Sequence, residues 1–433
     1  MTATPLPAGL MLVHGNHPEA LRDLLVTWIR RYPLAPLETE TVLVHSNGIA
    51  QWLRLALAED VEDGGCGIAA GLDLSLPSRF LWQAYRAVLG REAVPEASPF
   101  DKPLLVWRLM RLLPDLTGQA AYQPLRRFLA ADADLRKRFQ LAERLADLFD
   151  QYQVYRADWL AAWAAGEDVL IRAAGERAPL PDEQRWQACL WRALLADVAA
   201  GGNADLAGQG RAAVHEAFLA RVAGWPDDAP RPAGLPRRVL VFGISALPRQ
   251  SLEVLAALAR WSQVLMCVHN PCEHYWSDIV ADKELLRATR SRQQRRAGTP
   301  AEIDEDSLHL HAHPLLAAWG KQGRDFIGLL DEHDSDTARA GYLQHFVDIR
   351  QRIDLFAPHG TDRLLNQLQD DIRDLRPLGL TRDTWPPVAP GDDSIRFHIA
   401  HSPQREVEVL HDQLLAAFNA DATLRPRDVI VMV

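Results

Sequence analysis

The sequence contains few cysteines and no apolar run long enough to cross a membrane. Four cysteines in 433 residues do not form a disulfide framework. The N-terminus has no basic segment followed by a long apolar stretch, so it does not resemble a secretory signal. We therefore expect a cytoplasmic protein that makes no contact with a membrane.

The chain has no excess of positive charge, because its formal net charge is −10. Nonspecific binding to duplex DNA comes from Lys and Arg side chains that neutralise phosphates. A protein that coats duplex DNA is therefore disfavoured. Binding of nucleic acid in a local groove is still compatible with this sum, since charge acts patch by patch.

The motifs of the common catalytic classes are missing. No Gly-Lys-Ser or Gly-Lys-Thr occurs, and the nearest stretch, WGKQG at 319–323, lacks the hydroxyl that a phosphate-binding loop supplies to magnesium. No Gly-x-Ser-x-Gly elbow is present, and the acids do not form a two-metal nuclease pattern. We expect no ATP hydrolysis and no catalytic site in this chain.

The composition is that of an ordinary globular protein, with 48% hydrophobic and 24% charged residues. A chain of this length is expected to form two or three domains. Apolar runs at 9–16 and 41–47 are each followed by an amphipathic helix pattern, which predicts a parallel α/β layer. Helical spacing dominates from 77 to about 222, and strand patterns resume at 239–245 and 263–271.

The predicted fold is therefore α/β, with a parallel layer interrupted by a large helical insertion. Proline-rich stretches at 226–238 and 376–394 are predicted to be linkers. The expected division is a first α/β part at 1–76, a mainly helical subdomain at 77–225, the resumed α/β domain at 236–380 and the start of a second α/β domain at 392–433.

The last segment predicts a strand at 394–402, a helix at 405–419 and a strand at 428–433. The sequence stops inside this last apolar strand. Because a buried parallel strand normally continues into a crossover, we expect a truncated chain.

Two groups of candidate metal ligands occur, and both are closely spaced. Zinc sites usually use two short-spaced ligand pairs separated by a longer loop, so the first group is too compressed. A turn after a strand and a histidine-rich surface loop are the favoured interpretations, with a zinc site as the alternative. The two groups are Cys267, His269, Cys272 and His274, and His309, His311 and His313.

Two stretches carry side chains suited to nucleic acid. In the helix predicted at 141–159, Asp147, Asp150 and Gln151 lie three and four residues apart, hence on one face. Carboxylates and amides pair with base edges, whereas an ion pair between Arg144 and Asp147 would make this face an ordinary surface. The second stretch either contacts phosphates or forms a solvated charged face, and it holds Arg287, Arg290, Arg292, Arg295 and Arg296.

Several motifs, in order along the chain, resemble the RecC family, the gamma subunits of the bacterial RecBCD complex, exodeoxyribonuclease V. The similarity runs from about Gly9 to Val433 and covers only the N-terminal part of a longer family chain. The motifs that carry it are VHSNGIAQWL, LPSRFLW, LADLFDQYQVYRADW, VFGISALP, NPCEHYWSDI, HPLLAAWGKQGRDF and HSPQREVEVLHDQLL.

The resemblance implies a degenerate superfamily 1 helicase-like fold that lacks Walker motifs. It implies a heterotrimer with RecB-like and RecD-like subunits, which use ATP and magnesium, whereas this chain needs no cofactor of its own. It also implies contact with single-stranded and forked DNA, channelling of the unwound 3′-ended strand and recognition of the Chi signal in double-strand break repair. The alternative is a scaffold that stabilises the motor and nuclease subunits without reading DNA.

The resemblance further maps the Chi-reading positions of the family onto this chain. Single strands are held by stacking on aromatic rings and by polar contact with base edges, so these residue types suit the role. Where the better-known family member has glutamine and threonine, this chain has His45 and Asn47, which predicts a variant Chi sequence or weaker recognition. Burial in a helix core is the alternative for Trp82. The mapped residues are His45, Asn47, Gln51, Leu76, Trp82, Asp147, Leu148, Asp150, Gln151, Arg156 and Arg211.

Overall fold

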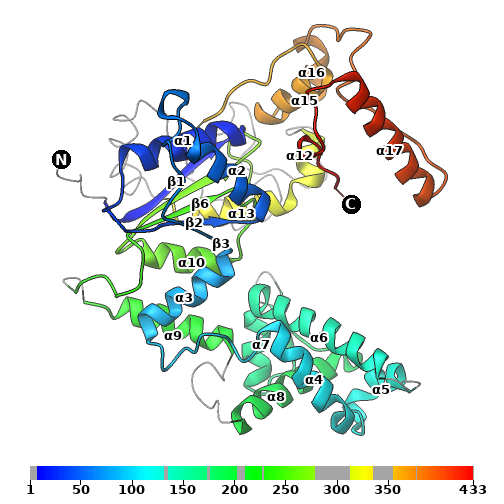
Figure 1. The fold of residues 1–433 in the computed structure, drawn as a ribbon. Coiled ribbons are helices and arrows are strands. Elements are labelled where there is room, and N and C mark those ends of the chain that lie inside the picture. Colours follow the sequence, from blue (N-terminus) through cyan, green and yellow to red (C-terminus); the bar gives the residue numbers. More distant parts are fainter. Residues whose placement is uncertain are drawn as a thin grey trace.

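A computed structural model of the chain describes residues 7–130, 135–172, 176–201, 210–226, 229–277, 313–334, 355–376 and 378–432. A five-stranded sheet lies at the centre of the fold, in the order β1-β7-β6-β2-β3, and every neighbouring pair is parallel (Figure 1). Its strands are β1 (Gly9–Gly15), β2 (Glu40–Val44), β3 (Leu72–Ser75), β6 (Arg238–Phe242) and β7 (Gln263–His269).

Side chains of the central strands alternate between two hydrophobic cores. Val239 and Val241 of β6 enter one core, whereas Leu240 and Phe242 enter the other. A strand buried on both faces has this period of two, and it needs apolar residues at every position. The first face is covered by α3 (Pro77–Leu89), α9 (Arg211–Ala223), α10 (Arg249–Leu258) and α13 (Lys321–Asp331), and the second by α1 (Pro18–Arg31) and α2 (Asn47–Ala58).

A separate core forms within the helical insertion, between α3 and α9. Trp191 is stacked on Phe149, with ring centroids 5.6 Å apart, and also contacts Phe100. These helices gather away from the sheet (Figure 1). The elements are α4 (Lys102–Leu116), α5 (Gln123–Leu129), α6 (Arg136–Tyr155), α7 (Ala157–Ala164), β4 (Val169–Ile171), β5 (Arg177–Pro179) and α8 (Arg185–Ala200).

The remaining helices follow β7, and most of the helices predicted from apolar spacing are confirmed. The helix predicted at 405–419 corresponds to α17, which buries none of its residues. None of the described helices combines the length and hydrophobicity needed to cross a lipid bilayer. The helices after β7, besides α13, are α12 (Pro314–Trp319), α15 (Leu364–Arg373), α16 (Leu378–Thr384) and α17 (Pro403–Ala420).

Three predictions about the C-terminal part are wrong. The described residues of 394–402 and 428–433 form no strand, and Phe397 is 91% exposed and Met432 90% exposed. Their alternation suits a strand, but a strand also needs a hydrogen-bonding neighbour, and the described part of the chain supplies none. The predicted linker at 376–394 contains the helix α16.

A buried ion pair joins the beginnings of β6 and β2. The Arg238 side chain is fully buried, and its guanidinium donates to both carboxylate oxygens of Glu40 and to the backbone carbonyl of Tyr32. These acceptor oxygens compensate the loss of water around the guanidinium, because a buried charge without partners would be costly in a low-dielectric interior. This contact fixes the amino edge of the sheet, opposite the edge at which the candidate site lies.

We predict that Arg238→Met lowers the free energy of unfolding by about 3–5 kcal/mol, because the Glu40 carboxylate stays buried without its cation. Urea unfolding measures the change. Arg237→Met is the matched control, because Arg237 pairs with Glu38 at a half-exposed position, and such a pair contributes at most about 1 kcal/mol. Equal losses for the two variants would contradict a special role for the buried pair.

Candidate nucleic-acid interface

A pocket of about 700 Å³ opens at the carboxyl edge of the sheet. His45 directly follows β2, Leu76 directly follows β3, and Ile244 lies just after β6, and all three line the pocket. Residues that follow parallel strands emerge at one edge, where open α/β sheets bind ligands. The loop after β6 turns at Gly243, whose φ is +67° and where a Cβ would lie 2.8 Å from Ile49.

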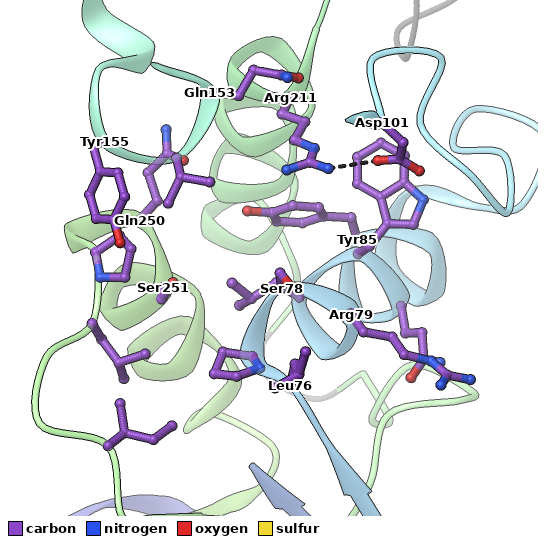
Figure 2. Close-up of a pocket in the computed structure, with 18 of the residues that line it drawn as sticks. Leu76, Ser78, Arg79, Tyr85, Asp101, Gln153, Tyr155, Arg211, Gln250 and Ser251 are labelled. Carbon is purple, nitrogen blue, oxygen red and sulfur yellow. Dashed lines mark hydrogen bonds and ion pairs between the residues drawn. The ribbon is translucent and has the colours of Figure 1, made fainter. Parts of the chain in front are cut away.

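The opposite wall comes from the helical insertion, so the pocket lies between the two bodies. Gln153 and Tyr155 at the end of α6 line it, together with Asp101, which precedes α4 (Figure 2). Clefts between separately packed cores are common ligand sites, because each wall is rigid and the gap is not filled by a shared core.

Four of the eleven predicted DNA-contacting residues line this pocket. They reach it from separate elements: the loop after β2, the residue before α3, the α3 helix and the first turn of α9. Leu76 is 52% exposed and offers an apolar surface there. The four residues are His45, Leu76, Trp82 and Arg211.

Trp82 is half-buried and belongs both to the edge of the sheet core and to the pocket wall. Its indole N–H donates to the carbonyl of Pro95 at 2.9 Å, and its ring lies edge-on to Tyr85 with centroids 6.2 Å apart. These contacts fix the ring plane. The alternative from the sequence, a core tryptophan, is therefore correct for part of the side chain, and the lining of the pocket accounts for the rest.

Arg211 joins three elements across the pocket. Its guanidinium donates to Asp101 at 2.6 Å and lies 3.4 Å from the Asp150 carboxylate of α6 (Figure 2 draws the first contact). Asp150 does not line the pocket itself, but it reaches the pocket through this ion pair. The two carboxylates hold the guanidinium in a defined direction while they neutralise its charge.

The other predicted residues of α6 lie outside the pocket lining. Asp147 pairs with Lys102 on α4 at 2.5 Å, in place of the intrahelical pair with Arg144 that the sequence favours as an alternative. This hydrogen bond raises the pKa of the Lys102 ammonium. Leu148 is half-buried and Gln151 is exposed. The predicted DNA-contacting face of α6 therefore already forms two ion pairs, Asp147 with Lys102 and Asp150 with Arg211.

The remaining predicted residues are also outside the lining. Asn47 and Gln51 are exposed in the first turns of α2, where Ser46 caps the helix by accepting from the backbone N–H of Ile49 at 3.3 Å. Arg156 lies over the Trp159 ring at 3.8 Å and donates to Asp158 and to the backbone carbonyl of Ile171. Its guanidinium is therefore already held by protein groups.

The structure adds pocket residues that were not predicted from the sequence. Tyr155 lines the pocket and is 67% exposed. Gln153 is 2% exposed and follows Phe149 at helical spacing on the buried stripe of α6. The helical spacing of α6 already placed a glutamine on an otherwise apolar stripe. This was a signal for a functional residue, because a buried amide needs polar partners.

A hydrogen-bond chain lies behind the pocket wall. The Tyr85 hydroxyl contacts Nδ1 of His215 at 3.0 Å, and Nε2 of His215 contacts the Glu253 carboxylate at 2.9 Å. Burial, and then the charge of Glu253, raise the pKa of Tyr85, which stays a neutral phenol. These two hydrogen bonds connect α3, α9 and α10 and hold the Tyr85 ring against Trp82.

The charge of the lining is mixed. Arg79, Arg86 and Arg211 contribute three cations, while Glu96 and Asp101 contribute two carboxylates. The Arg86 side chain donates to the backbone carbonyl of Val94 at 3.1 Å. A pocket of this kind suits the edges and rings of bases better than a row of phosphates, which needs a surplus of cations.

The candidate metal ligands are used in other ways where the structure describes them. In the described ranges, no three His, Cys, Asp or Glu side chains come together in a way that could hold an ion. Cys267 and Cys272 are both buried, and burial raises the pKa of each thiol to about 12. His313 is buried and caps α12, so it does not belong to a surface loop. His309, His311 and the arginine run at 287–296 lie outside the described residues.

Residues 10–375 match the family described as RecC, N-terminal domain. The chain belongs to the RecC family. The RecBCD enzyme subunit RecC of Escherichia coli (strain K12) is 38% identical over 447 residues, which cover 98% of this chain and 37% of the relative. The resemblance seen in the sequence motifs is thereby confirmed.

Two further RecC relatives also match nearly the whole chain and a limited part of their own length. The RecBCD enzyme subunit RecC of Haemophilus influenzae (strain ATCC 51907 / DSM 11121 / KW20 / Rd) is 34% identical, over 98% of this chain and 38% of the relative. The protein of the same name from Mycobacterium tuberculosis (strain ATCC 25618 / H37Rv) is 29% identical, over 92% of this chain and 32% of the relative. The chain thus spans about a third of the length of these RecC proteins.

In this RecC family chain, the hydrogen bond between His215 and Glu253 behind the pocket is expected to make the free energy of unfolding depend on pH. The hydrogen bond from His215 holds the pKa of Glu253 below its ordinary value of 4.5. A carboxyl group whose pKa is lowered in the folded state stabilises the fold above its unfolded pKa, and this stabilisation is lost as the pH falls through the folded value.

We predict that Glu253→Gln lowers the free energy of unfolding by about 1 kcal/mol near pH 6, and that the difference disappears well below pH 4. Urea unfolding over this pH range measures it. Glu216→Gln is the control, because Glu216 is an exposed residue of the same helix as His215. A Glu253 effect that does not change with pH would contradict the role of the charge.

Proposed function

We propose that this chain is a non-catalytic, DNA-binding part of a RecBCD-type helicase and nuclease. In this proposal it guides the unwound 3′-ended strand and recognises the Chi sequence during double-strand break repair by homologous recombination. The observation that carries the proposal is the pocket, where four residues that the family resemblance maps to Chi-reading positions converge from separate elements: His45, Leu76, Trp82 and Arg211.

The chemistry of the lining supports a base-binding role. Trp82 and Tyr155 present aromatic rings, and a single-stranded base stacks on such rings. Arg211 presents donors of fixed direction, because Asp101 and Asp150 hold it from two sides. A duplex hides the faces of its bases, so a pocket that offers rings together with polar groups selects unpaired nucleotides.

The recognised sequence is proposed to differ from that of the better-known family member. His45 lines the pocket, and an imidazole presents a donor and an acceptor at different positions from the amide of a glutamine. Asn47 is exposed at the start of α2, two residues after His45. A variant Chi sequence or weaker recognition is the expected consequence.

The other members of the complex also belong to this proposal. RecB-like and RecD-like subunits would form the heterotrimer and would bind the ATP and magnesium, while forked and single-stranded DNA would contact this chain. The fold would be a superfamily 1 helicase-like α/β fold that has lost its Walker motifs, and the complex would work in the bacterial cytoplasm. The sequence supports this division of labour, since no Gly-Lys-Ser or Gly-Lys-Thr occurs.

We predict that Trp82→Ala weakens binding of a single-stranded oligonucleotide by about 5- to 160-fold, which corresponds to the roughly 1–3 kcal/mol of one stacked base. Fluorescence anisotropy with the full chain measures the dissociation constant. Trp107→Ala is the matched control, because Trp107 is 66% exposed and lies outside the pocket lining. Near-ultraviolet circular dichroism checks that both variants keep their folded core.

The alternative, a scaffold that does not read DNA, makes the opposite prediction. Asp150→Ala releases one partner of Arg211 and, in the assembled complex, should abolish the response to Chi while unwinding continues. If the chain is only a scaffold, the Asp150→Ala complex would keep both the response to Chi and the unwinding activity. Unchanged oligonucleotide binding by Trp82→Ala, together with an intact Chi response of Asp150→Ala, would refute the proposal and favour the scaffold.

A further inference from the structure

Two helices that cover the sheet begin at the pocket with uncapped N-termini. The helix α3 begins at Pro77 and α10 at Arg249, and no side chain caps the first turn of either. Both first turns contribute to the lining, α3 through Ser78 and α10 through Gln250 and Ser251 (Figure 2). The first backbone N–H groups of a helix have no intrahelical acceptor, and the helix dipole adds positive potential there. This wall of the pocket therefore favours an anion.

The Ser251 hydroxyl is a second and independent sign of a ligand. Ser251 is 5% exposed, and its Oγ forms no hydrogen bond with any residue that the structure describes. This oxygen is not among the buried side-chain atoms that are closed off without a partner, and Ser251 lines the pocket, so a bound molecule can reach it. Because buried hydroxyls almost always have a partner, the free Oγ indicates a missing ligand atom.

Further polar groups of the same wall are also free within the described ranges. The Ser78 hydroxyl and the Gln250 amide make no hydrogen bond there, and the exposed Arg79 side chain makes no ion pair. One of the lining carboxylates, that of Asp101, is already paired with Arg211. The mixed charge of the pocket disfavours a row of phosphates. A single phosphate, however, needs only a cation and a few well-placed donors.

We propose that one backbone phosphate of the single DNA strand binds at the N-termini of α3 and α10, where the Ser251 and Ser78 hydroxyls donate to it and Arg79 supplies the cation. Trp82 lies four residues after Ser78, on the same side of α3 and about 6 Å along its axis. This separation is comparable to the distance from a base to its own phosphate, so one nucleotide can occupy both places.

The inference rests on the proposed function and assigns these residues a separate part in it. Phosphate contacts fix the register and orientation of a nucleic acid but carry no sequence information. Ser78, Arg79 and Ser251 would thus position the strand while other residues of the pocket contact its bases.

The test removes the charge of the phosphates and the hydroxyl of the protein, singly and together. The full chain is titrated with a short oligodeoxythymidylate and with its methylphosphonate analogue, which keeps the bases and sugars but has a neutral backbone. We expect the wild type to prefer the charged strand. Ser251→Ala should narrow this preference about tenfold, the effect of one hydrogen bond to a charged group. Its affinity for the neutral strand should stay unchanged, which also shows that the variant is folded.

Ser75→Ala is the matched control. Ser75 is also a buried serine whose Oγ has no partner, but this oxygen is closed off and the residue lies outside the pocket lining. This variant should keep the preference of the wild type for the charged strand. Ser78→Ala changes an exposed residue at the start of α3 and should narrow the preference in the same direction as Ser251→Ala. It tests the same site if Ser251→Ala does not fold.

Each other outcome has a defined meaning. Equal binding of the charged and neutral strands by the wild type would overturn the inference, and so would a preference that survives in both Ser251→Ala and Ser78→Ala. If these variants weakened only the binding of inorganic phosphate, the site would belong to a free anion and the inference would be wrong. An effect of Trp82→Ala without an effect of either serine variant would keep the proposed function and refute this inference alone. Absence of any oligonucleotide binding by the wild type would refute both.

Discussion

All five strands of the sheet run in the same direction, and the rest of the candidate site depends on this constraint. Because β2, β3 and β6 are parallel neighbours in the sheet, the residues that follow them emerge side by side. His45, Leu76 and Ile244 therefore form one wall of the pocket although they are far apart in the sequence. An antiparallel arrangement would send one of them to the opposite edge. The direction of the strands thus determines where a ligand can bind.

The second wall belongs to another core, and polar contacts hold the two together. Arg211 begins α9, which packs against the sheet, and its ion pairs reach Asp101 and Asp150 in the helical insertion. Trp82 and Tyr85 pack on the sheet side, whereas Gln153 comes from the insertion. A ligand in this pocket would touch both bodies at once. Such a position is compatible with the strand recognition that we propose.

The sequence predicted the existence of elements better than their partners. Apolar spacing defined α4 and α8 because each buries one stripe against its neighbours. The short strand β3 was missed, because its pairing with β2, and not its own pattern, makes it a strand. The converse error occurred at 394–402, where the alternation is present but no described segment pairs with it.

The site shows the same division. Helical spacing placed Asp147 and Asp150 on one face, but their partners, Lys102 and Arg211, come from distant segments that no local pattern indicates. The pocket residues that were predicted came from family similarity. Gln153 was not predicted, although a glutamine on the buried stripe of α6 was a signal in the sequence, because the groups around the amide are known only from the fold.

The central claim is that bases of a single DNA strand enter the pocket between the sheet and the helical insertion. Photocrosslinking with a strand that carries 5-iododeoxyuridine tests it most directly, since this base reacts with the aromatic rings that it touches. Mass spectrometry should find the crosslink on Trp82 or Tyr155, the rings that line the pocket. Crosslinks confined to aromatic residues elsewhere, such as Trp107 or Phe397, would contradict the account.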